Sequence, residues 1–90
     1  MLRTLTVVDP EVHKESLVQD GTLAEAGSLL AIVTGSARSL LAAERVALNL
    51  LGQLSGVATA TRELVDQIAG TSASLVDTRK TVPGLRALQK

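Results

Sequence analysis

The sequence predicts an α+β fold, and three observations predict it. Short β-rich runs separated by turn residues occupy residues 4–36. From Arg38 onward the apolar residues recur every three or four positions, as they do on a helix. A strand-length apolar run, Ala73–Val76, then precedes a helix start at Pro83. We therefore expect a strand-rich segment, then helices, then a strand–loop–helix unit.

The strand-rich segment is expected to begin with a strand at Thr4–Val8, which an Asp-Pro turn ends. The stretch Asp20–Gly35 has the rhythm of two strands separated by a glycine turn, the second being Ser28–Thr34. Lipoyl- and biotinyl-type carrier modules share this rhythm, but they present a lysine at a tight hairpin, and none stands here. His13 lies in a polar stretch and is expected in an exposed loop.

Two helices are expected after the strands. An apolar stripe with alternating spacings of three and four marks the first, and it consists of Leu40, Ala43, Ala47, Leu50 and Leu54. Polar residues are so sparse over residues 40–51 that this helix should be buried on several sides, between layers or at a subunit interface. Ser55 and Gly56 are predicted to end it, with Ser55 as the N-cap of the second helix. Gly70 fits the position just past the end of that second helix.

Composition excludes several classes of function. The chain has no cysteine and one histidine, which excludes a disulfide framework and a zinc site, so we expect no metal ligands here. No run approaches the ~18 apolar residues of a membrane span, and we expect a cytoplasmic protein without membrane contact. The chain is 46% apolar without one aromatic residue. More apolar surface than a small domain can bury suggests an oligomer or part of a longer chain.

The charges are unevenly distributed, although the net charge is zero. Residues 1–37 have a balance of −3 and residues 38–90 a balance of +3. The last twelve residues contain four cations and no acid. Such an excess attracts anions, either small ligands or an acidic neighbour. Nucleic acid is not expected, because there are no aromatic side chains for stacking and no long basic stripe.

Arg79 and Lys80 are the first candidate site, since they follow the predicted strand at its carboxyl end, where ligands gather in parallel α/β sheets. An Arg fork can bind a carboxylate through two hydrogen bonds, and a Lys is a mobile charge suited to phosphate. Asp77 and the hydroxyls of Thr78 and Thr81 could orient them. The alternative is a solvated loop with an incidental Asp77–Arg79 ion pair.

Arg45 is the second candidate. It shares one helical face with Arg38, Asn49 and Gln53. This face is either the solvated side of the helix, or it projects Arg45 into a ligand site. A run of small residues at 55–61 could let backbone N–H groups approach an anion, but tight helix packing explains it without a ligand.

Two blocks of the sequence resemble the signature of the quinolinate phosphoribosyltransferases, also called nicotinate-nucleotide pyrophosphorylases (carboxylating). They are LLAAERVALNLLGQLSGVATAT and DTRKTVPGLRALQK, and the looser similarity upstream extends the match to most of the chain. The resemblance implies an N-terminal α+β sandwich domain followed by an α/β barrel. Residues 1–54 would belong to the first domain, with its long apolar helix. Residues 55–90 would hold a helix, the first barrel strand with its loop, and the start of the next helix, so the chain does not complete the barrel.

The resemblance also implies a function. Such enzymes transfer phosphoribosyl from phosphoribosyl pyrophosphate, with Mg²⁺, to quinolinate, and they yield nicotinate mononucleotide, pyrophosphate and carbon dioxide for NAD biosynthesis. Thr78, Arg79 and Lys80 would bind substrate, with Arg79 and Lys80 catalytic. Arg45 would reach the neighbouring subunit's site in a homodimer or larger homo-oligomer. The Mg²⁺ ligands would lie beyond Lys90.

Two interpretations follow. In the first, the chain is an N-terminal fragment of this transferase and is inactive as ninety isolated residues. In the second, it is a non-catalytic module that uses residues 38–54 to dimerise or to pack on a partner.

Overall fold

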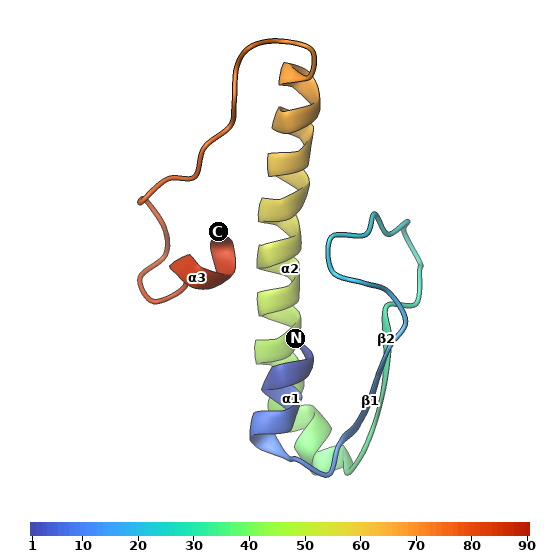
Figure 1. Cartoon of the computed structure of the whole chain (residues 1–90). Helices are drawn as coiled ribbons and strands as arrows, with labels where there is room; N and C mark the ends of the chain where they lie inside the picture. Colours follow the sequence, from blue (N-terminus) through green and yellow to red (C-terminus); the bar gives the residue numbers. More distant parts are fainter. The chain divides into compact units, whose positions relative to one another are not determined.

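The computed structural model describes all of residues 1–90 and has both helices and strands, which confirms the α+β class. The chain divides into two compact units, Met1–Leu51 and Gly52–Lys90, and each is described by itself. The elements in chain order are α1 (Leu2–Val8), β1 (His13–Ser16), β2 (Ala31–Thr34), α2 (Ala37–Ile68) and α3 (Arg86–Gln89) (Figure 1). None of these helices combines the length and the apolar character needed to cross a membrane.

The two strands form an antiparallel pair in the first unit, with His13 opposite Thr34 and Ser16 opposite Ala31 (Figure 1). The predicted strand at Ser28–Thr34 is confirmed in its last four residues. Its partner is β1 rather than the segment just before it, because the chain between the strands turns at two glycines with left-handed φ values near +80°, which glycine adopts without steric cost. His13 is exposed as expected, but it lies in β1 rather than in a loop.

The predicted strand at Thr4–Val8 is wrong, since these residues belong to helix α1. Leu2 and Leu5 lie three positions apart on one face of this helix, and both pack in the core with Ala43 of α2. Burial of that face outweighs the β preference of the threonines and valines, which is a weak intrinsic effect. Only Leu5 is buried in α1.

The core of the first unit is small. Its buried members are Leu5, Val12 and Ala43, and the partly buried Leu2, Val33 and Leu40 pack against them. Helix α1, the strand pair and the first turns of α2 each contribute to it. The buried positions of α2 are Ala43 and Ala47, so only the two alanines of the predicted apolar stripe are buried.

Helix α2 is one continuous helix of 32 residues, and the predicted break at Ser55 and Gly56 is wrong (Figure 1). Ser55 lies in the helix interior, where its carbonyl accepts a 2.9 Å hydrogen bond from the Thr59 hydroxyl. A glycine in a helix costs about 1 kcal/mol relative to alanine, too little to end a helix whose apolar spacing continues on both sides. The helix instead starts after Ser36, whose Oγ accepts the Ser39 N–H at 3.1 Å, the geometry of an N-cap.

The second unit follows the predicted order with two differences. Gly70 ends α2 with a φ of +82°, as expected. The run Ala73–Val76 is exposed and forms no strand, because a strand needs a neighbouring strand to accept and donate its backbone hydrogen bonds, and none is available here. The final helix starts at Arg86 rather than at Pro83, since Pro83 and Gly84 form a turn before it.

Candidate functional site

The two adjacent cations lie in a short segment that we call the cationic loop, residues 77–82. Local hydrogen bonds shape its backbone. The Lys80 N–H donates to Thr78 Oγ1 at 3.1 Å, and the Thr81 N–H donates to the Arg79 carbonyl at 3.0 Å. A threonine hydroxyl that accepts from the N–H two residues later forms a turn and bends the chain. The loop therefore curves at Arg79 and Lys80.

A tight turn connects the cationic loop to α3. The Leu85 N–H donates to the Val82 carbonyl at 3.0 Å. Pro83 takes the first central position of this turn and Gly84, with a φ of +79°, the second. This is the residue order of a type II turn, which requires a positive φ at its second central residue. The Val-Pro-Gly-Leu sequence thus sends the chain directly from the loop into α3.

Two side chains of α3 contact the two ends of the cationic loop. Arg86 Nη2 donates to Asp77 Oδ2 and Arg86 Nη1 donates to the Thr78 carbonyl, both at 3.0 Å. Gln89 Oε1 accepts the Val82 N–H at 3.0 Å. The side chains of Arg86 and Asp77 are 43% and 45% exposed, so solvent screens their ion pair and its contribution to stability is modest.

The side chains of Arg79 and Lys80 are exposed and make neither a hydrogen bond nor an ion pair. The pair considered between Asp77 and Arg79 does not form, since the Asp77 carboxylate binds Arg86 instead. The N–H donors of both side chains are therefore free to bind another anion. An Arg fork suits a carboxylate and a Lys ammonium beside it suits a phosphate.

Arg45 lies in the first unit, on α2, and Thr78, Arg79 and Lys80 lie in the second. Its side chain is exposed and has no ion-pair partner. Arg38 and Asn49 lie on the same face and are exposed as well, whereas the buried Ala43 and Ala47 lie on the opposite face. Within this chain the face with Arg45 is solvated, and it leaves the guanidinium accessible.

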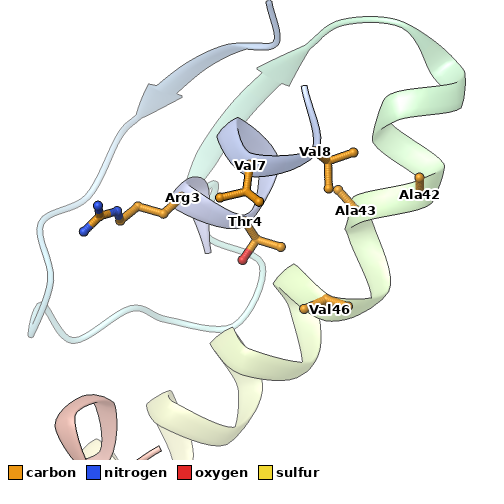
Figure 2. Close-up of a pocket in the computed structure, with 7 residues that line it drawn as sticks. All are labelled: Arg3, Thr4, Val7, Val8, Ala42, Ala43 and Val46. Atoms are coloured by element: carbon orange, nitrogen blue, oxygen red, sulfur yellow. The ribbon is translucent and has the colours of Figure 1, made fainter. Parts of the chain in front are cut away.

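An apolar groove of about 390 Å³ separates α1 from α2 in the first unit (Figure 2). Thr4, Val7 and Val8 of α1 face Ala42, Ala43 and Val46 of α2 across it. Arg3 is its single charged lining residue. A groove with this lining does not suit a dicarboxylate, because burying charge without partners is costly. None of the predicted site residues lines it.

The chain offers no group of three or more His, Cys, Asp or Glu side chains that could hold a metal ion. The candidate loop itself is cationic, and its one carboxylate is already bound by Arg86. These donors do not fit a Mg²⁺ site, which uses carboxylate, phosphate and water oxygens.

Sequence reasoning missed Arg86 and Gln89 as residues of the site. Both stand in the quoted block DTRKTVPGLRALQK, after the Pro-Gly turn. The signal that could have revealed them is that a tight turn brings the residues before and after it together. The single acid of this block could then have been paired with Arg86 across the turn rather than with Arg79.

Comparison with known proteins gives two family matches that together span almost the whole chain. Residues 2–55 match the quinolinate phosphoribosyl transferase N-terminal domain, and residues 57–90 match the C-terminal domain of the same family. A nicotinate-nucleotide pyrophosphorylase (carboxylating) of Mycobacterium leprae is 53% identical over 73 residues, which cover 81% of this chain and 26% of that protein. Quinolinate phosphoribosyltransferase (decarboxylating) 1b of Nicotiana tabacum is 41% identical, over 92% of this chain and 23% of its own length.

A solved structure gives the same result for the fold. The crystal structure of NadC from Streptococcus pyogenes matches with a TM-score of 0.90 at 40% sequence identity. The match covers 97% of this chain and 31% of that one. The chain thus spans between about a quarter and a third of the length of the proteins it resembles. This share is consistent with the expectation that the chain is part of a longer protein.

Proposed function

The chain belongs to the quinolinate phosphoribosyltransferase family, and we propose that it supplies part of the active site of an enzyme that transfers phosphoribosyl to quinolinate. The products would be nicotinate mononucleotide, pyrophosphate and carbon dioxide, a step of NAD biosynthesis. The observation that carries the proposal is the cationic loop, where Arg79 and Lys80 are exposed without an internal partner. The two substrates are a dicarboxylate and a polyphosphate, both of which need such cations.

Each loop residue has a proposed role. Arg79 would bind a carboxylate of quinolinate through two parallel N–H donors, with the Thr78 hydroxyl beside it. Lys80 would bind the pyrophosphate of phosphoribosyl pyrophosphate as a mobile charge. The turn that bends the loop at these residues supports this assignment, because it places both side chains on an exposed curve. Pre-positioned cations stabilise charge that develops in a transition state at little reorganisation cost.

The proposed reaction is a displacement at the ribose C1 atom. The pyridine nitrogen forms the new N–C bond with its lone pair, and the C–O bond to pyrophosphate breaks, with its electron pair leaving on the pyrophosphate oxygen. Lys80 would stabilise this leaving negative charge. The carboxylate next to the ring nitrogen is then lost as carbon dioxide, and the carbon that it leaves takes up a proton. Arg79 would hold the dicarboxylate in line with the ribose carbon throughout.

We extend the proposal to the neighbouring subunit, the metal ion and the cellular location. Arg45 would reach the site of a neighbouring subunit in a homodimer or larger homo-oligomer, and its exposure and lack of an ion-pair partner support that role. Mg²⁺ would accompany phosphoribosyl pyrophosphate, with protein ligands outside these ninety residues. We place the enzyme in the cytoplasm. The ninety residues alone would not turn over.

One observation favours the second candidate, a non-catalytic association module. Leu41 and Leu48 of α2 are 68% and 57% exposed, one heptad apart and hence on the same side of the helix. Exposed apolar side chains that lie together on one side of a helix can form part of a protein–protein contact, where they make a contiguous patch. This surface is compatible with an enzyme subunit as well, and the cationic loop has no role in the module interpretation.

The test is an assay in which chromatography measures the nicotinate mononucleotide formed from quinolinate and phosphoribosyl pyrophosphate. The protein as its gene encodes it is expected to form the product with Mg²⁺, and Lys80→Ala is expected to lose most of that activity. A protein that folds and binds neither substrate would refute the proposal and leave the association module.

A further inference from the structure

We propose that Arg86 is a positioning residue, which holds the cationic loop in shape and keeps Asp77 from competing with the ligand for Arg79. The inference rests on the proposed function, because it assigns Arg86 to the same quinolinate site. Its basis is the pair of 3.0 Å hydrogen bonds from one guanidinium to Asp77 Oδ2 and to the Thr78 carbonyl.

The geometry of this contact needs an arginine. Two different nitrogens of one planar group reach two successive residues, so Arg86 bridges the Asp77 side chain and the Thr78 backbone. A lysine has a single nitrogen on a flexible stem and lacks the fixed fork that reaches both acceptors in one plane. Charge-assisted hydrogen bonds of this kind are about twice as strong as neutral ones. Arg86 therefore fixes the entry to the loop.

A second contact fixes the exit. Gln89 Oε1 accepts the Val82 N–H at 3.0 Å. Arg86 and Gln89 stand three positions apart in α3, so they lie on the same side of this short helix. One helical turn thus holds both ends of the cationic loop. Only Arg79, Lys80 and Thr81 lie between the fixed ends.

The charge arrangement gives Arg86 its second effect. Asp77 is the only acid among the last 24 residues of the chain, and it stands two positions before Arg79. As long as Arg86 binds Asp77, Arg79 has no internal carboxylate partner. Without Arg86 the freed carboxylate would become a local competitor of the ligand for Arg79, at a high effective concentration.

The test uses the protein as its gene encodes it and measures the Kd of quinolinate by calorimetry and its KM and kcat by steady-state kinetics. Arg86→Gln is expected to weaken quinolinate binding about five- to tenfold, with a smaller effect on kcat. The quinolinate affinity of Arg86→Lys is expected to lie between that of Arg86→Gln and that of the wild type. The matched control is Arg62→Gln, which removes another exposed Arg–Asp pair of the second unit and should leave the Kd unchanged.

The rescue experiment separates competition from simple loss of structure. Adding Asp77→Asn to Arg86→Gln removes the competing carboxylate and is expected to recover part of the lost affinity. Quinolinate affinity of Arg86→Gln equal to that of the wild type, or a double variant that binds no better than Arg86→Gln, would overturn the proposal. If Arg86→Gln does not fold, the same measurement is made on Arg86→Lys. A quinolinate affinity of Arg86→Lys equal to that of the wild type would then overturn the proposal.

A readout without quinolinate keeps the inference distinct from the proposed function. Amide hydrogen exchange at Lys80 and Val82 reports whether the loop is held, and Arg86→Gln is expected to speed it, whereas Arg62→Gln should not. If the wild type does not bind quinolinate, the proposed function fails while this measurement still decides whether Arg86 holds the loop. Unchanged exchange rates in Arg86→Gln would refute that role.

Discussion

The hydroxyl of Ser39 donates a 2.6 Å hydrogen bond to Oδ2 of Asp9, across thirty residues of sequence. The contact joins the residue that ends α1 to the first turn of α2. The Glu11 N–H donates to the other carboxylate oxygen of Asp9 at 2.9 Å. Both donors, Ser39 first, lower the pKa of Asp9 below its ordinary value of 3.8, and a small desolvation effect opposes them. Ionised Asp9 is therefore one of the contacts that hold α1 against α2.

The first prediction concerns pH. A lowered pKa in the folded state means that Asp9 stabilises the fold above pH 3.8 and that this contribution is lost as the pH falls through the lower, folded-state value. Asp9→Asn should therefore lower Tm at neutral pH, and the difference from the wild type should shrink below pH 3.8. Asp20→Asn is the control, since the Asp20 side chain is exposed and makes no hydrogen bond or ion pair. A Tm difference that stays constant down to pH 2 would contradict the role of Asp9.

The second prediction concerns the packing of Gly35 against the core. A Cβ at this position would lie 2.9 Å from Val12 Cγ2, and Val12 is buried and has a stiff, β-branched side chain. Gly35→Ala should destabilise the protein by about 1–3 kcal/mol, measured by denaturant unfolding. Gly52→Ala is the matched control, because a Cβ there meets nothing within 4 Å and should stabilise α2 by about 0.5–1 kcal/mol. Equal effects of the two changes would refute this packing.

The third prediction tests the continuity of α2. Gly56 lies in the interior of this helix, so Gly56→Pro should cost about 3 kcal/mol by removing a hydrogen bond and clashing with the preceding turn. Had a second helix started at Gly56, proline would be tolerated there as a first helical residue. Gly56→Ala separates the loss of glycine from the effect of proline. A cost near zero for Gly56→Pro would show that the helix is interrupted.

The fourth prediction concerns Arg45 and the neighbouring subunit. If each site combines Arg45 of one subunit with Lys80 of the other, Arg45→Ala and Lys80→Ala should each be inactive alone. Refolding equal amounts together should restore about one quarter of the wild-type activity, because half of the dimers are mixed and each has one intact site. A mixture as inactive as its two components would place Arg45 and Lys80 in the same subunit's site or outside it.

Several features of the fold could be predicted from the sequence because they depend on local patterns. The alternating spacing from Leu40 to Leu54 predicts a helix, since such residues share one face. Gly70, predicted to follow the second helix, lies just past the end of α2. The final four residues of Ser28–Thr34 form the expected strand. The cationic loop and the exposure of its two cations also follow from local sequence, because a run of polar residues before Pro-Gly is typical of a turn.

Features that depend on tertiary contacts could not be predicted in this way. The helix α1 forms where β-rich residues stand, because Leu5 is buried with Ala43, far along the chain, and the partly buried Leu2 packs against them. Helix α2 continues through Ser55 and Gly56, because the cost of a glycine inside a helix, about 1 kcal/mol relative to alanine, is too small to end it. Asp77 forms its ion pair with Arg86 rather than with Arg79, because the Pro-Gly turn brings α3 back to the loop.

Binding of quinolinate to the cationic loop is tested most directly by titration calorimetry of the protein as its gene encodes it, wild type against Arg79→Ala, with Arg62→Ala as the control for loss of an exposed arginine. We expect a measurable affinity in the wild type and in Arg62→Ala that is lost in Arg79→Ala at unchanged Tm, because the Arg79 side chain has no hydrogen-bond or ion-pair partner to lose. Equal quinolinate affinity in the wild type and Arg79→Ala would contradict it.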